Sequence, residues 1–108
     1  MSYQFLQLEQ HGLVAYVWLN RPELHNAFNT TVIEELHTCF KQLAIRDDIR
    51  IVVLAGRGKS FSAGADLNWM KQAGQACAEE NEADALKLAQ MLEALATLKQ
   101  PTIARVHG

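Results

Sequence analysis

The stretch Ile51-Val52-Val53-Leu54-Ala55-Gly56 is a short, β-branched run that ends at a glycine, and it decides the fold class. Its length and composition are typical of a buried strand. Residues 31–45 precede it with apolar side chains at helical spacing, and residues 14–19 form an earlier apolar run. Strand, helix and strand in this order predict a right-handed crossover between parallel strands. We therefore expect an α/β fold.

A β-hairpin is predicted at the amino-terminal end of the chain. Residues 5–10 and 14–19 read as two strands, and Gly12 between them can take the positive φ that a short connection needs. The second strand is apolar on both faces, which favours an inner strand with a layer on each side. Pro22 follows it, and proline cannot donate a hydrogen bond to a strand ladder.

Two helices and a last strand complete the predicted elements. In the first helix, over 31–45, Thr31 and Glu34 match a capping box. A second helix is expected from Glu79 to Leu98, ending before Pro101. A strand over 102–106 follows. The apolar residues that lie on one side of the second helix are Ala85, Leu88, Ala89, Leu92, Leu95 and Ala96.

Composition limits the class of protein. With 108 residues, 49% of them hydrophobic, the chain has room for one globular domain. The formal net charge is −2 and no run of Lys or Arg occurs, so we expect no nucleic-acid partner. Neither a secretory leader nor a membrane-spanning stretch is predicted. Cys39 and Cys77 form no metal-like pair, which favours reduced thiols in a cytoplasmic protein.

The segment Phe61-Ser62-Ala63-Gly64-Ala65-Asp66-Leu67-Asn68-Trp69-Met70 is the strongest candidate for chemistry. Three small residues stand before Asp66, which can cap a short helix that begins at Leu67. The N–H groups of such a turn are bare of side chains and lie in the field of a helix amino terminus, so the turn can bind an oxyanion. Residue types alone leave the alternative of a loop that merely reverses the chain.

Other candidate motifs are weaker evidence for a functional site. Gly56-Arg57-Gly58-Lys59-Ser60 follows a strand, as a phosphate-binding loop does, but the first glycine of that motif would fall at Val53 and no helix follows. The four histidines show no metal-ligand spacing on one helical face, so no metal site is predicted. Ser60 and Ser62 have no assignable base and are interpreted as loop hydroxyls.

Four blocks of the chain carry a resemblance to a known family. The blocks are Asn20-Arg21-Pro22-Glu23-Leu24-His25-Asn26-Ala27-Phe28, Ile51-Val52-Val53-Leu54-Ala55-Gly56, Phe61-Ser62-Ala63-Gly64-Ala65-Asp66-Leu67 and Lys99-Gln100-Pro101-Thr102-Ile103-Ala104-Arg105-Val106-His107-Gly108. In this order they resemble the enoyl-CoA hydratase/isomerase family, also called the crotonase family, and the resemblance spans essentially the whole chain. Blocks one and three look most similar to methylglutaconyl-CoA hydratases of leucine breakdown and their isoprenoid-catabolic relatives.

The resemblance implies a fold and a set of site residues. The fold is a crotonase-like ββα superhelix, of which residues 1–108 are the amino-terminal part of an incomplete domain. The backbone N–H of Ala65 is implied as one of two oxyanion-hole donors to the thioester carbonyl. Coenzyme A enters as part of the substrate, with no bound cofactor. The positions implied to contact substrate or CoA are Leu24, Ala63, Gly64, Ala65, Asp66, Leu67 and Asn68.

The resemblance also implies an activity. The parent protein is expected to be an enoyl-CoA hydratase, a lyase that adds water across the 2,3 double bond of an acyl-CoA thioester in fatty acid or leucine catabolism. The two catalytic glutamates and the second oxyanion donor of the family fall after the position of Gly108, so we expect this chain alone to be inactive. An isomerase, another family reaction, and a non-catalytic binding or assembly fragment stay open. The parent protein is expected to be a homotrimer or hexamer, and a free fragment to aggregate through uncovered apolar faces.

Overall fold

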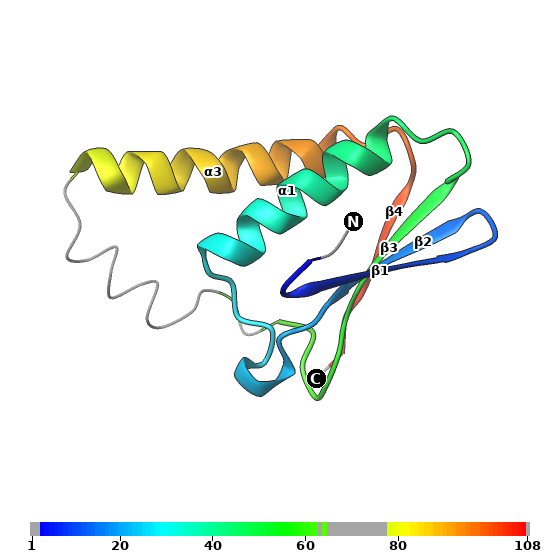
Figure 1. The fold of residues 1–108 in the computed structure, drawn as a ribbon, viewed down its shortest axis with the longest axis horizontal. Coiled ribbons are helices and arrows are strands. Elements are labelled where there is room, and N and C mark those ends of the chain that lie inside the picture. Colours follow the sequence, from blue (N-terminus) through cyan, green and yellow to red (C-terminus); the bar gives the residue numbers. More distant parts are fainter. Residues whose placement is uncertain (1–2, 63, 65–77, 108) are drawn as a thin grey trace.

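A four-stranded sheet with helices on one side forms the described part of the computed structural model, which covers residues 3–62, 64 and 78–107 (Figure 1). α1 and α3 contact one another, and α1 crosses α3 at an angle. The chain ends that the structure describes lie far from the turn between the first two strands. The elements are β1 (Leu6–His11), β2 (Val14–Leu19), the short 3-10 helix η1 (Pro22–Leu24), α1 (Thr30–Ala44), β3 (Ile51–Gly56), α3 (Ala78–Ala96) and β4 (Thr102–Arg105).

The strands lie in the order β1-β2-β3-β4, and this arrangement confirms the predicted α/β class. β1 and β2 form the expected antiparallel hairpin, with Gly12 at a φ of 62° in the connection. β2 and β3 are parallel, with Val14 opposite Ile51 and Leu19 opposite Gly56. β4 extends the sheet in parallel beyond β3. The carboxyl ends of β2, β3 and β4 therefore meet at one edge of the sheet, where the loops that follow them lie together.

The core lies between the sheet and α1. Ala15, Val17 and Leu19 alternate along β2 and are at most 1% exposed, facing the helices. Phe40 on α1 is fully buried against them. Full burial of one such large apolar side chain stabilises the fold by about 1.5–3 kcal/mol. The other members of this buried cluster are Leu6, Val32, Ile33, Leu36, Cys39, Leu43, Ile49, Val52 and Met91.

The opposite face of the sheet carries aromatic and cationic side chains. Tyr16 and Trp18 of β2 stack there with ring centroids 6.3 Å apart, and both are half-buried. The Arg57 guanidinium lies 3.8 Å from the centroid of the Trp18 ring and donates to Glu9 at 2.6 Å. β2 is an inner strand, as predicted, with β1 and β3 as its neighbours. Among the described residues, helices cover one of its faces, and no second layer covers Tyr16 and Trp18 on the other, so the prediction of a layer on each side is met in part.

The amino terminus of α1 corrects one local prediction. Asn29, and not Thr31, is the N-cap, and its side-chain oxygen accepts from the Val32 N–H at 2.9 Å. Glu34, the expected partner in a capping box, instead accepts from Lys87 of α3 at 2.9 Å. The neighbouring Glu35 accepts from the backbone N–H groups of Gln4 and Phe5. The carboxylates of Glu34 and Glu35 therefore both make contacts distant in sequence, and neither caps the helix.

The predicted second helix is present as α3, and its apolar side is only partly buried. Leu88 and Leu95 pack against the core, and Met91, which is 3% exposed, is a core residue that the sequence pattern did not single out. Leu92 is 51% exposed, and the alanines at 85, 89 and 96 are also exposed. The expectation that this apolar side is left partly uncovered agrees with these exposures.

The cysteine that the structure describes is a core residue. Cys39 on α1 is 1% exposed and unpaired. Burial raises the pKa of its thiol to about 11, which keeps it protonated at neutral pH. A buried, protonated thiol is a poor nucleophile, so Cys39 contributes packing and not chemistry. Cys77 lies outside the described residues.

Replacing the observed cap tests the helix boundary. We expect Asn29→Ala to lower the free energy of unfolding by about 1 kcal/mol, because the Val32 N–H loses its acceptor. Chemical unfolding followed by circular dichroism measures this loss. Thr31→Ala is the matched control and should be close to neutral. An equal or larger loss in the control would show that the helix is capped at Thr31.

Candidate functional site

Two loops meet at the carboxyl edge of the sheet. One runs from Asn20 to Phe28 after β2, and the other from Arg57 onward after β3. They are neighbours because β2 and β3 are parallel and end side by side, with Leu19 opposite Gly56. The Arg57 N–H extends this pairing by donating to the Leu19 carbonyl at 2.9 Å. The resemblance blocks that are distant in sequence are thus brought together.

Asn26 joins the two loops. Its side chain is buried, at 2% exposure, and its Oδ1 accepts from the Arg21 N–H at 2.8 Å. Its Nδ2 donates to the carbonyls of Arg57 and Ser60, each at 2.8 Å. All the strong hydrogen-bonding directions of the amide nitrogen are used, as a buried polar group requires. One side chain therefore connects three backbone groups, one in the first loop and two in the second.

The first loop is strained where it presents this side chain. η1 ends at Leu24, and its C-cap His25 has a φ of 52°, which is followed by a φ of 56° at Asn26. The left-handed region costs an L-residue about 1–2 kcal/mol, although asparagine tolerates it better than most. His25 also places Nδ1 3.2 Å from the Ser60 hydroxyl oxygen. Consecutive left-handed residues persist only where surrounding contacts hold them, and the contacts of Asn26 do so here.

Glycines allow the close approach of the loops. A Cβ at Gly56 would lie 2.6 Å from the Phe61 carbonyl oxygen and 2.9 Å from Asn26 Nδ2. A Cβ at Gly58 would lie 2.7 Å from Cβ of Pro22. The nearest atoms at Gly56 belong to backbone and to a fully bonded amide, so they cannot move aside cheaply. A side chain there would separate the loops.

Gly64 is fixed by contacts on both of its backbone polar groups. Its φ is 87°, and its carbonyl accepts from the Phe28 N–H at 2.6 Å. Its own N–H donates to the Ser62 hydroxyl at 3.1 Å, and that hydroxyl donates to the Asn26 carbonyl at 3.0 Å. The positive φ explains why glycine stands at this position. The loop that was predicted to bind an oxyanion is thus anchored on the first loop.

The structure describes only part of the predicted site. Gly64 is exposed and held as above, and Leu24 lies in η1 with 45% of its surface exposed. The remaining predicted positions lie outside the described residues: Ala63, Ala65, Asp66, Leu67 and Asn68. Their roles stay predictions.

The hydroxyls and cations of these loops have structural contacts. Ser62 connects the loops, and Ser60 has the His25 ring nitrogen as a neighbour that the sequence did not reveal. Among the described residues no third group orients His25 as the base of a nucleophilic pair would require. Arg21 donates to the Ala27 carbonyl at 3.0 Å and lies over the Phe5 ring, which accounts for it without a phosphate partner.

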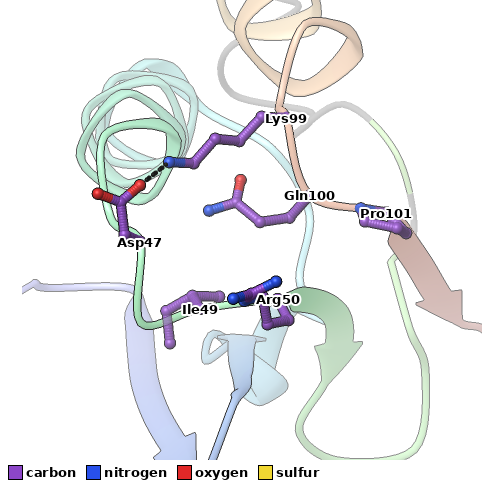
Figure 2. A pocket seen from close by; sticks show the side chains of 6 residues that line it. All are labelled: Asp47, Ile49, Arg50, Lys99, Gln100 and Pro101. Carbon is purple, nitrogen blue, oxygen red and sulfur yellow. Dashed lines mark hydrogen bonds and ion pairs between the residues drawn. The ribbon is translucent and has the colours of Figure 1, made fainter.

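A pocket lies at the amino ends of β3 and β4, at the opposite end of these strands from the two loops. Figure 2 shows this open pocket of about 490 Å³, which is lined by residues just before β3 and β4. Lys99 donates to Asp47 at 2.6 Å, a contact that lowers the pKa of the Asp47 carboxyl. Gln100 is 5% exposed, and its Nε2 donates to the carbonyls of Leu43 and Arg46 at the end of α1. The Gln100 Oε1 has no partner among the described residues.

The described residues offer neither a metal site nor a membrane span. Within residues 3–62, 64 and 78–107, no cluster of three or more histidine, cysteine, aspartate or glutamate side chains could hold a metal ion. No helix in these ranges is both long enough and apolar enough to cross a membrane.

A comparison with known families gives a match over most of the chain. The profile described as enoyl-CoA hydratase/isomerase matches residues 9–108. A crotonyl-CoA hydratase of Syntrophomonas wolfei is 32% identical, over 100% of this chain and 41% of its own length. A mitochondrial Delta(3,5)-Delta(2,4)-dienoyl-CoA isomerase of Mus musculus is 35% identical, over 99% of this chain and 35% of its own length.

Solved structures agree with the sequence matches. The crystal structure of an enoyl-CoA hydratase from Shewanella pealeana superimposes with a TM-score of 0.94 at 37% identity, covering 97% of this chain and 40% of that one. The chain thus spans about 40% of the length of the proteins that it matches.

Adding a methyl side chain at Gly56 tests the contact between the loops. We expect Gly56→Ala to lower the free energy of unfolding by about 1–3 kcal/mol, because the added methyl group overpacks a closed site. It should also speed amide hydrogen exchange in residues 57–62, read by mass spectrometry. Gly12→Ala is the control, since a Cβ there meets nothing within 4 Å and only the positive φ opposes it. Unchanged exchange in 57–62 for Gly56→Ala would contradict the packing described.

Proposed function

Because this chain belongs to the enoyl-CoA hydratase/isomerase family, we propose that it forms the thioester-binding part of an enzyme that adds water across the 2,3 double bond of an enoyl-CoA. The observation that carries this proposal is the anchored Gly64. It follows the carboxyl end of a parallel strand, with a φ of 87° and with its carbonyl held by the Phe28 N–H. Ligands of open α/β sheets bind at such carboxyl ends.

The Ala65 N–H is the proposed oxyanion donor. A trans peptide directs its N–H away from its carbonyl. Since the Gly64 carbonyl is bonded toward Phe28, the following N–H is proposed to face away from the first loop, toward the thioester. A donor fixed before reaction stabilises the enolate that forms when water adds, by about 3 kcal/mol for a single donor.

The CoA part of the substrate is proposed to lie along the same edge of the sheet. Leu24 supports this, since an exposed apolar residue in η1 can contact a pantetheine chain. The small residues Ala63 and Gly64 would let the thioester approach the backbone. Asp66, Leu67 and Asn68 complete the proposed contacts. No bound cofactor or metal takes part, because the family's chemistry needs only the thioester carbonyl, the two donors and an acid–base pair.

Acid–base catalysis is proposed to come from outside this chain. Hydration needs a group that removes a proton from water and one that protonates the α-carbon. The chain covers about 40% of its relatives, which supports placing both glutamates and the second donor in the remaining part. We further propose that the whole protein is a cytoplasmic homotrimer or hexamer. The alternative is an isomerase, which the 35% identity to the murine dienoyl-CoA isomerase favours.

An assay of the isolated chain tests the division of the site. We expect the purified 108-residue chain to leave the absorbance of a conjugated 2-enoyl-CoA thioester unchanged, because it lacks the acid–base groups. An active crotonyl-CoA hydratase is the positive control. Measurable hydration by this chain would show that its own residues suffice. Product analysis with the whole protein separates the hydratase, which forms a 3-hydroxyacyl-CoA, from the isomerase.

Removal of one backbone donor tests the oxyanion role. In the whole protein we expect Ala65→Pro to lower kcat by about 100- to 1000-fold, because proline has no N–H to offer the enolate. Ala65→Gly keeps the N–H and should retain most of the activity. Steady-state kinetics provide the measurement. Comparable kcat values for the proline variant and the unmodified protein would refute the role of this N–H.

A further inference from the structure

We propose that Asn26 is a positioning residue that holds the thioester-binding loop in its reactive place. The inference rests on the function proposed above and deepens it. Asn26 itself need not touch the substrate. Its effect on the reaction would pass through the backbone of Arg57, Ser60 and Gly64, which its side chain and its carbonyl hold directly or through Ser62.

The hydrogen bonds of Asn26 specify one arrangement of the loops. Its Nδ2 can meet the Arg57 and Ser60 carbonyls, and its Oδ1 can meet the Arg21 N–H, in only one orientation of the amide. A flipped amide would oppose oxygen to two carbonyl oxygens and nitrogen to an N–H. At 2% exposure no bulk water compensates for such a mismatch. The contacts therefore fix the separation and direction of both loops.

A second connection carries this constraint to Gly64. The Asn26 carbonyl accepts from the Ser62 hydroxyl at 3.0 Å, and the Ser62 hydroxyl oxygen in turn accepts from the Gly64 N–H at 3.1 Å. Phe28, two residues after Asn26, donates to the Gly64 carbonyl. Gly64 is thus held on both sides by one short segment. A displacement of Asn26 would pass directly to the peptide that precedes Ala65.

The chain offers a matched comparison for a purely structural amide. Gln100 is also buried, and its Nε2 also donates to two backbone carbonyls, those of Leu43 and Arg46. It lies at the amino ends of the strands, away from the loops (Figure 2). Loss of either amide should affect stability, but only Asn26 can affect the geometry around Gly64.

The experiment compares Asn26→Asp with Gln100→Glu in the whole protein that contains this chain, with a short 2-enoyl-CoA as substrate. Each change replaces a donating NH₂ group by a carboxyl oxygen of nearly the same shape. We expect Asn26→Asp to lower kcat by about 10- to 100-fold with a smaller change in KM. It should also speed hydrogen exchange in residues 57–64. Gln100→Glu should lower the Tm similarly while kcat stays close to that of the unmodified protein.

The pH profile gives a signature that loss of stability would not produce. A buried carboxyl that faces two carbonyl oxygens has a raised pKa, and only its protonated form can donate one of the lost hydrogen bonds. The kcat of Asn26→Asp, relative to the unmodified protein, should therefore rise as pH falls. The Gln100→Glu ratio should show no such rise.

The outcomes separate the two proposals. If the unmodified protein neither binds nor converts the thioester, the proposed function is wrong. If it does so and the Asn26 and Gln100 variants lose kcat equally, or without the pH signature, the positioning role is wrong. Should Asn26→Asp fail to fold, Ser62→Ala tests the same connection, with an expected several-fold loss of kcat at unchanged Tm. Full activity of Ser62→Ala would then overturn the inference.

Discussion

The in-register parallel pairing of β2 with β3 is the constraint on which the rest of this structure depends. It places Leu19 opposite Gly56, so that both strands end at the same edge and the loops that follow must share one space. α1 makes the return connection and buries Phe40 against the sheet. A shift by one residue would turn Ala15 and Val17 away from α1 and separate the loops.

The shared space is filled by backbone and not by large side chains. Glycines 56 and 58 allow contact distances that a Cβ would prevent, and a single buried carboxamide satisfies the polar groups left between the loops. Strain at residues 25 and 26 is the cost of aiming that carboxamide. An oxyanion-binding peptide works only if it is in place before charge develops, since reorganisation during the reaction would consume the stabilisation. The rigid contact between the loops fits this requirement.

Much of the fold could be predicted from the sequence, because β2 and β3 are short apolar runs that end at a turn or a glycine, and because Gly12 marks the hairpin before them. The cap of α1 was misplaced because Asn29 and Thr31 both suit a helix start, and only the Val32 N–H shows which one is used. The burial of Met91 on α3 is not predicted from the sequence, because small and apolar residues surround this helix. The role of Asn26 was missed for a different reason. The two carbonyls to which its Nδ2 donates lie 31 and 34 residues away, and no local pattern encodes a contact that only the parallel pairing creates.

The central claim is that the edge formed by the loops after β2 and β3 receives an acyl-CoA thioester. Amide hydrogen exchange of the whole protein, measured with and without a non-reactive acyl-CoA analogue, tests this most directly. The account predicts slower exchange in residues 21–28 and 57–64 when the analogue is present, and unchanged exchange in residues 47–50 and 99–101 at the opposite end. Protection confined to the opposite end, or none in either loop at saturating analogue, would contradict it.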